Sequence, residues 1–173
     1  MPQSNKTIPS PAATAHALQC GTPGHAPSHV CFWQPRHRLL ISGDHVLGRV
    51  SPYYDYDYTP DPAGEFLASL DRVEALDARL ALSGHGRTFG DVAGHIDANR
   101  ELVGQRIAAV ERALRDGGPL TAFEALPRVF DEPLTPMNTT RRLSETLSYL
   151  RHLQVTGRAA ADGASPERWS VAA

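Results

Sequence analysis

The chain has 173 residues, of which 41% are hydrophobic and 21% charged, and its formal net charge is -2. These values exclude a strongly basic polyelectrolyte and a wholly disordered chain, and they fit one medium domain or two small ones. No apolar run is long enough to cross a bilayer, and the first residues show no secretory h-region. With Cys20 and Cys31 as the only cysteines, we expect a reducing, cytoplasmic setting, no disulfide and no membrane partner.

Residues 1–20 are rich in Pro, Ser, Ala and Thr and show neither helical nor strand periodicity. This composition predicts a disordered leader.

The segment from Thr22 to His29 places two histidines behind a Pro-Gly turn and directly before the apolar run 30–33. The prolines on both sides of His25 and the glycine before it argue against a helix, although the spacing of His25 and His29 would fit one. A rigid loop that enters a strand holds an imidazole at a fixed angle. His25 is therefore the better candidate for a metal ligand.

The next elements predict a layered α/β unit. Strands are expected at 30–33 and 39–42, joined by a charged hairpin turn, and a third strand at 79–82. Between them, apolar residues recur at helical spacing from Asp61 to Asp77, which gives a β-α-β order. The segment 51–62 is rich in Tyr, Asp and Pro and should be irregular. Its tyrosines could line a substrate groove or cap the core from outside, and the sequence leaves both alternatives open.

Polar groups follow the second and third strands after a small residue and a glycine. Ser42-Gly43-Asp44 ends one strand, and Ser83-Gly84-His85 ends the other. Together with the loop of His25, three strand ends each offer a metal ligand.

This series of motifs resembles the metallo-β-lactamase fold, in particular the glyoxalase-II-like and lactamase-B-like hydrolases. The resemblance implies that His25 binds a first zinc ion, that His85 binds a second, and that Asp44 is the catalytic carboxylate that bridges them. It places His29 behind the ligands, without contact to metal. Ser28 stands where the family usually has Gly, and the family's His-x-His-x-Asp-His motif appears nowhere in the sequence.

The pattern changes near residue 94. Helices are predicted at 95–115, at 122–129 and from about Asn138, followed by a β-hairpin that reaches Val171. Three helices and a hairpin resemble the small winged helix that follows the hydrolase domain in some lactamase-B-like proteins. The expected fold is thus α/β: the second half of a four-layer αββα metallo-β-lactamase fold over residues 21–93, and a winged-helix domain over 94–173.

The resemblance implies a zinc-dependent hydrolase of a small-molecule thioester, lactone, lactam or phosphodiester. The complete family site holds two zinc ions, and only part of that ligand set is present. We therefore expect a truncated form with impaired or no activity alone, and a complementing N-terminal half or a second copy of the chain as partner. Whether the chain is a gene fragment or one half of a split enzyme stays open, and the sequence identifies no substrate-binding residues.

The alternative function is non-catalytic: binding of nucleic acid or another partner through the winged helix. The arginines that could meet phosphates are Arg141, Arg142 and Arg151 on the third helix and Arg158 and Arg168 on the wing. Acidic and basic residues from His95 onward are equal in number, so no basic stripe supports this alternative.

Overall fold

The computed structural model describes residues 16–172. Residues 1–15 of the predicted leader lie outside this range. Four strands form one sheet in the order β1-β2-β3-β4. Their bounds are Leu18–Gly21, Val30–Gln34, Leu39–Gly43 and Leu80–Ser83. Residues 18–20, predicted as part of the leader, are instead in β1. They form a strand because they pair with the exposed edge of β2, a tertiary contact that composition does not reveal.

The connections of the sheet agree with the predicted order. A short 3-10 turn, η1 (Pro35–His37), closes the β2–β3 hairpin, and the side chain of Gln34 accepts a hydrogen bond from the His37 N–H at 2.7 Å. Strands β3 and β4 are parallel and are joined through helix α1 (Pro62–Glu74). The carboxyl ends of these two strands therefore lie side by side.

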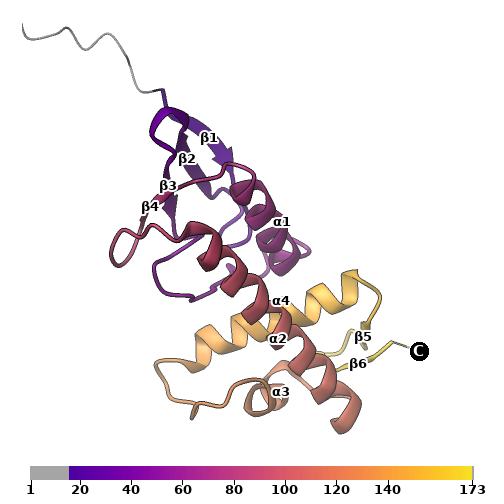
Figure 1. Cartoon of the computed structure of the whole chain (residues 1–173). Coiled ribbons are helices and arrows are strands. Elements are labelled where there is room, and N and C mark those ends of the chain that lie inside the picture. Colours follow the sequence, from indigo (N-terminus) through magenta and orange to yellow (C-terminus); the bar gives the residue numbers. More distant parts are fainter. Residues whose placement is uncertain (1–15, 173) are drawn as a thin grey trace, which may run out of the picture.

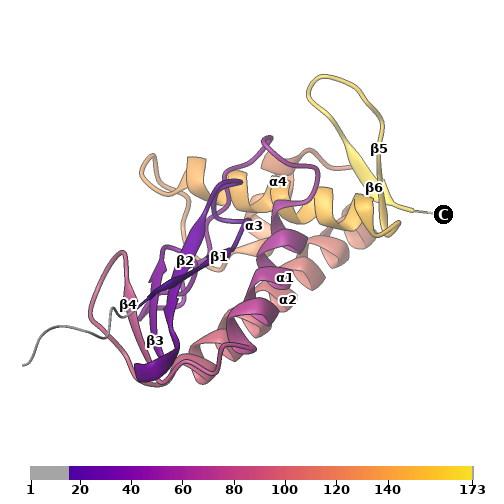
Figure 2. The ribbon, with the colours of Figure 1, turned by 90° about the horizontal axis from the view of Figure 1, so that it is seen from above.

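Helix α1 covers one face of the sheet (Figure 2). Asp61 caps its first turn by accepting a hydrogen bond from the Gly64 N–H at 2.8 Å, and Pro62 pre-sets the first helical residue. Its apolar stripe and the inward residues of the strands share one core, which includes Cys31, Trp33, Leu40, Phe66, Leu70, Val73 and Ala81. Cys20 lies opposite Cys31 across β1 and β2, and both thiols are free.

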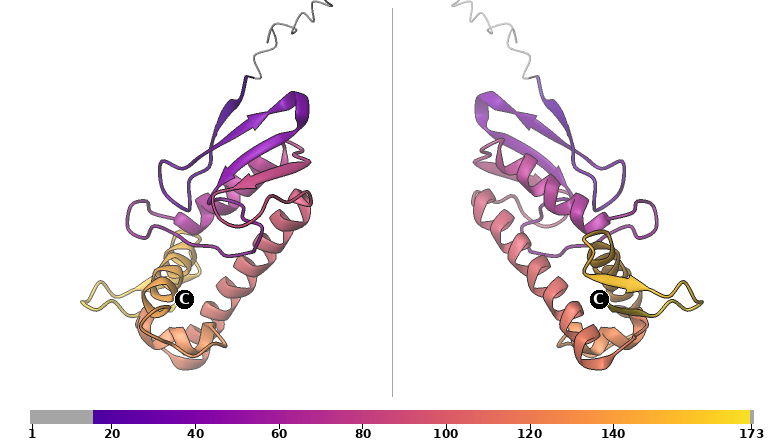
Figure 3. Two further views of the ribbon diagram at one scale, coloured as in Figure 1. Left: turned by 90° about the vertical axis from the view of Figure 1, so that its left-hand side faces the viewer. Right: turned by 90° about the vertical axis from the view of Figure 1, so that its right-hand side faces the viewer.

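No helix covers the other face of the sheet within residues 16–172 (Figure 3). Phe32, Ile41 and Leu82 lie next to one another across β2, β3 and β4. Phe32 is 40% exposed and Ile41 is 48% exposed, which is unusual for neighbouring large apolar side chains.

The C-terminal half is helical. Helix α2 (Val92–Gly117) runs from the sheet to the far end of the molecule, where α3 (Ala122–Val129) and α4 (Thr139–Val155) pack on it (Figure 1). Strands β5 (Ala159–Ala161) and β6 (Trp169–Val171) pair antiparallel at the end of the chain. All of these elements occur where the periodicity predicts them. Helix α2 begins three residues early, because Asp91 caps it, so the expected domain boundary at 93/94 falls in its first turn.

The two halves share one hydrophobic core. Tyr54, from the irregular segment before α1, is fully buried. Its ring makes edge contacts with Phe66 of α1 and with Tyr149 of α4, each at a centroid distance of 5.6 Å. Tyr54 is thus part of the core itself rather than a cap on its outside. None of the helices in the described part of the chain is long and apolar enough to cross a membrane.

Candidate functional site

The loop of His25 is fastened to helix α1. Gly24 has φ +125°, and a Cβ atom there would lie 2.5 Å from the backbone Cα of Phe66. Only glycine allows this close approach. Ser69 of α1 donates a hydrogen bond to the Pro23 carbonyl at 2.8 Å, and the Asp55 N–H donates to the His25 carbonyl at 3.0 Å. The backbone that carries His25 is thus fixed from both sides.

Asp44 and His85 come from the adjoining carboxyl ends of β3 and β4. The Gly84 N–H donates a hydrogen bond to the Gly43 carbonyl at 2.7 Å and continues the parallel ladder past the strand ends. A Cβ atom at Gly84 would overlap Oδ1 of Asp44. The glycine before His85 therefore makes room for the carboxylate of the neighbouring strand.

The three predicted ligands converge on one atom. Nε2 of His25 lies 3.7 Å from Oδ2 of Asp44, and Nε2 of His85 lies 3.4 Å from the same oxygen. The second carboxylate oxygen, Oδ1, is buried and has no hydrogen-bond partner among the described residues. His85 is largely exposed, with 77% of its side chain accessible. The structure thus brings together the residues predicted at three separate strand ends.

His29 supports this arrangement from behind. Its Nδ1 lies 2.7 Å from the Thr22 hydroxyl oxygen, and its Nε2 accepts a hydrogen bond from the Asp44 N–H at 3.2 Å. Burial, followed by the nearby His25, lowers the pKa of His29, which favours the neutral ring that can accept this bond. Both nitrogens are engaged within the protein. His29 therefore orients the Asp44 backbone.

His45 points away from the cluster, into the core. It is 2% exposed, and its ring meets Phe66 edge-on at a centroid distance of 4.9 Å. Neither ring nitrogen has a hydrogen-bond partner within the described residues. Burial lowers the pKa of His45 to about 3, so it is neutral near pH 7. It is a core residue rather than a ligand.

Sequence reasoning missed the residues that wall the site. His25, Asp44 and His85 open on a cavity of about 230 Å³ that is also lined by Leu47, Ser51, Tyr53 and Arg141. The ring of Tyr53 lies 5.5 Å from that of His25. Tyr53 of the irregular segment lines this cavity, while its neighbour Tyr54 is in the core. Arg141 comes from α4, and no sequence signal connects it with the sheet.

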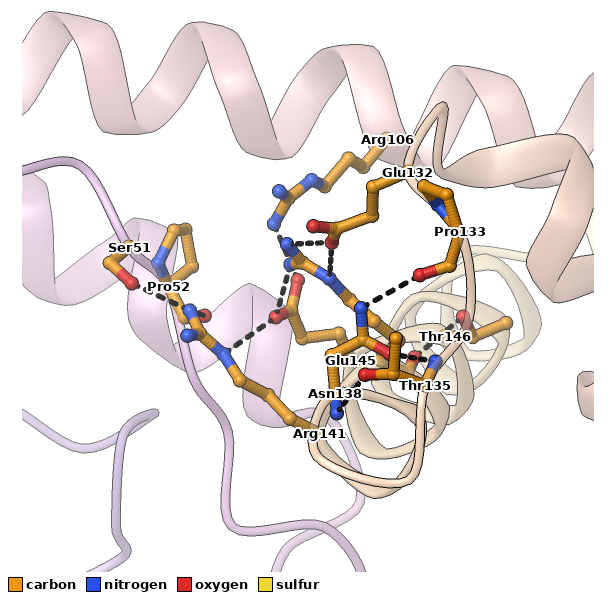
Figure 4. Close-up of polar contacts among 11 residues, drawn as sticks. Ser51, Pro52, Arg106, Glu132, Pro133, Thr135, Asn138, Arg141, Glu145 and Thr146 are labelled. Carbon is orange, nitrogen blue, oxygen red and sulfur yellow. Dashed lines mark hydrogen bonds and ion pairs between the residues drawn. The ribbon is translucent and has the colours of Figure 1, made fainter.

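Arg141 is held by a buried carboxylate. Glu145 is fully buried and binds the guanidinium groups of Arg106, Arg141 and Arg142 (Figure 4). Burial raises the pKa of Glu145, so the three cations are needed to keep it ionised. Arg141 also donates hydrogen bonds to the Ser51 hydroxyl at 2.6 Å and to the Pro52 carbonyl at 3.2 Å. Helix α4 is thereby tied to the loop beside the candidate site.

The arginines of the nucleic-acid alternative are engaged within the protein. Besides the contacts of Arg141 with Glu145, the ion pairs are Arg142 with Glu132 and Glu145, Arg151 with Glu167, Arg158 with Glu111, and Arg168 with Glu124. Guanidinium groups that already pair with carboxylates are poor partners for phosphates, because the pairs would first have to open.

The donors fit a metal ion in chemistry but not in number. Two imidazole nitrogens facing one carboxylate oxygen, with the other oxygen buried and unpaired among the described residues, are groups that zinc accepts. Within residues 16–172, however, no group of three or more His, Cys, Asp or Glu side chains is arranged to hold a metal ion. The three side chains therefore have the chemistry of metal ligands without the arrangement of a metal site.

The fold and the cluster define an α/β protein of the metallo-β-lactamase type. The family model described as "Metallo-beta-lactamase superfamily" matches residues 16–85, which include His25, Asp44 and His85. Residues 16–85 are thus similar to this superfamily, whose members are typically metal-dependent.

Its relatives are considerably longer. A metallo-beta-lactamase family protein of Thermus thermophilus has 30% sequence identity and a TM-score of 0.77, over 95% of this chain and 55% of its own. The "Beta-lactamase-like protein 2 homolog" of Caenorhabditis elegans is 26% identical over 113 residues, which are 65% of this chain and 36% of the relative. The "Atrochrysone carboxyl ACP thioesterase" of Aspergillus terreus is 25% identical over 162 residues, 87% of this chain and 47% of the relative. The chain thus spans about half or less of the length of these proteins.

Proposed function

We propose that His25, Asp44 and His85 are ligands in a zinc-dependent hydrolase site, with Asp44 shared between two ions. The observation that carries this proposal is the approach of two Nε2 atoms to one oxygen of Asp44, while its other oxygen is buried without a partner among the described residues. A buried carboxylate oxygen without a hydrogen bond costs free energy. A cation bound at Oδ2 between the two Nε2 atoms would offset part of the cost of burying this carboxylate.

The residues of the chain have separate roles in this proposal. A bound zinc ion would lower the pKa of a water molecule and polarise the scissile carbonyl or phosphoryl oxygen. His29 and the Gly84 backbone hold Asp44 in place, as their contacts indicate. Tyr53 and Arg141 line the space above the cluster. Among the expected substrate classes, the name of the thioesterase relative favours a thioester.

We further propose that this ligand set is completed by a complementing segment or by a second copy of the chain. One His and a shared Asp for each ion fall short of the three protein ligands of a typical catalytic zinc site. The exposed apolar face around Phe32 and Ile41 offers a surface on which a second sheet could pack, as in the four-layer αββα fold. In the other form of this proposal, a second copy of the chain packs on this face and gives a homodimer.

The C-terminal elements support the winged-helix proposal. Helices α2, α3 and α4 are followed by the β5–β6 hairpin. Leu120, between α2 and α3, forms an antiparallel β-bridge with Trp169 of β6 through two backbone hydrogen bonds of 3.0 and 2.8 Å. Trp169 is fully buried against these helices. We propose that this unit positions the wall of the cavity over the sheet through Arg141. Binding of nucleic acid is disfavoured, since the arginines named above are paired with acidic residues.

Metal analysis tests the site directly. Purified protein is dialysed against zinc, and the bound metal is measured for the wild type and for His25→Ala, Asp44→Asn and His85→Ala. Exposed His37 supplies the control, His37→Ala. We expect weak zinc binding that each site variant reduces and the control does not. Equal zinc content in the wild type and all three site variants would refute the ligand assignment.

Activity is tested on thioester, lactone and phosphodiester substrates. We expect no hydrolysis above background by this chain alone, because loss of supporting groups already costs about ten- to a hundred-fold and loss of direct ligands costs more. A chimera that restores a relative's His-x-His-x-Asp-His half should gain turnover, and Asp44→Asn should abolish it. Stoichiometric zinc and turnover in the unmodified chain would show that other ligands complete the site.

A further inference from the structure

A second cavity opens beside His85. It has a volume of about 590 Å³ and is lined by residues 47–49, Ser51 and residues 85–89. It shares Leu47, Ser51 and His85 with the smaller cavity over Asp44. The two cavities therefore adjoin along these three residues, and we refer to them together as the cleft; His25 and Asp44 line its smaller part.

The walls of the larger cavity are held in place by the fold. Phe89 pairs with Ala81 of β4 through backbone hydrogen bonds of 2.9 and 3.1 Å, which fixes the end of the loop 84–89. The ring of Phe89 lies 4.3 Å from that of His95 on α2, and Nε2 of His95 lies 3.2 Å from the Gly48 carbonyl oxygen. A Cβ atom at Gly48 would lie 3.1 Å from the Arg87 carbonyl oxygen, so the two loops are in close contact.

Two arginines that lack partners among the described residues border this cavity. Of the sixteen arginines of the sequence, all of which lie in the described range, four have neither a side-chain hydrogen bond nor an ion pair to a described residue: Arg36, Arg49, Arg87 and Arg112. Arg49 and Arg87 both line the cavity, on the two loops that Gly48 brings together. Within residues 16–172, no acidic residue lines this cavity, and Asp44 is the only acid that lines the smaller one. Apolar walls from Leu47 and Phe89 complete the lining.

We propose that this cleft binds a substrate with an anionic group, a phosphate or a carboxylate, at Arg49 and Arg87. An apolar segment of the substrate would lie along Leu47 and Phe89, and the bond to be hydrolysed would lie at the end with Asp44 and His85. The proposal rests on the proposed hydrolase site and narrows its substrate to anionic acyl compounds or phosphoesters. Guanidinium groups bind phosphate and carboxylate through paired hydrogen bonds, and two of them select an anion over a neutral analogue.

Binding is measured by calorimetry and NMR titration on the whole chain in the presence of EDTA. The probes are hexyl phosphate, hexanoate and the neutral 1-hexanol, which share one apolar segment. We expect at least one anionic probe to bind ten-fold or more tightly than 1-hexanol, with resonances of residues 47–51 and 85–89 shifting. The stronger of the two anionic probes identifies the group as phosphate or carboxylate. Affinity should fall as salt rises, because salt screens the charges.

Variants assign the effect to the two arginines. Arg49→Gln with Arg87→Gln should weaken the anionic probe at least ten-fold and leave 1-hexanol unchanged. The control is Arg36→Gln with Arg112→Gln, which removes the same charge at the other two arginines without partners among the described residues. This control should leave the affinity for each probe unchanged. An equal loss in both double variants, equal affinity for 1-hexanol, or no detectable binding of either anionic probe would overturn the proposal. Because EDTA removes metal, this result is independent of whether zinc binds at Asp44.

Discussion

The buried His45 should make the protein lose stability in mild acid. The pKa of His45 is lowered to about 3 by burial, from the ordinary value of 6.5. The unfolded chain therefore takes up a proton on this ring below pH 6.5, whereas the folded chain does so only near pH 3. In that window the unfolded state binds more protons, so the free energy of unfolding rises with pH and falls on acidification. The stabilising effect is fully present above pH 6.5.

The size of the effect follows from the pKa difference. One pKa unit corresponds to about 1.36 kcal/mol, so His45 alone should lower the free energy of unfolding by about 2 kcal/mol between about pH 7 and pH 5. Most carboxylates stay ionised in this range. His29 acts in the same direction, because burial lowers its pKa as well. A single substitution at His45 should therefore remove most, but not all, of the pH dependence.

Urea unfolding at several pH values between about 5 and 7 measures this. His45→Leu, of similar volume, should flatten the curve by about 2 kcal/mol over this range. The exposed turn residue His37 supplies the matched control, and His37→Leu should leave the wild-type slope intact. If His45→Leu kept the wild-type slope, the reasoning would be wrong. His45 would then take up its proton equally well in the folded and the unfolded protein.

Three further predictions concern the loop of His25, the link to α4 and the exposed sheet face. Gly24→Ala should lower the free energy of unfolding by about 1–3 kcal/mol or more in urea, since φ is +125° and the new Cβ meets the Phe66 backbone. Arg141→Lys keeps the charge but loses the fork that reaches Ser51, so hydrogen exchange should quicken in residues 50–56 and not in α2. Unchanged exchange there would contradict this link. Ile41→Asp should reduce light scattering by the concentrated protein without lowering its helix content, because Ile41 is 48% exposed on an apolar face.

Much of the fold could be predicted because local signals agree with it. The Thr121 capping box, Asp61 before Pro62, and the apolar stripes of α1, α2 and α4 all mark elements that the structure contains. Strand β1 was missed, because its four residues become a strand only by pairing with β2. Periodicity describes a segment's own faces and carries no information on a pairing partner.

The candidate site could be predicted in part for a similar reason. His25, Asp44 and His85 each follow a recognisable turn at a strand end, and parallel strands bring such ends together. Arg141 could not be predicted, because it reaches the cavity from a helix that lies far along the chain from His25. That Arg87 lacks a pairing partner among the described residues is likewise a property of the folded chain.

The buried Glu145 explains how the helical half bears on the cavity over the sheet. A carboxylate without solvent is costly, and it stays charged only with cations around it, so Glu145 fixes the guanidinium of Arg141. That guanidinium also donates a hydrogen bond to the hydroxyl of Ser51, which lies two residues before Tyr53 at the cavity. Tyr54, the next residue, is locked in the core against α1 and α4. The wall of the candidate site is thus held on one side by an ion pair and on the other by packing, and both originate in α4.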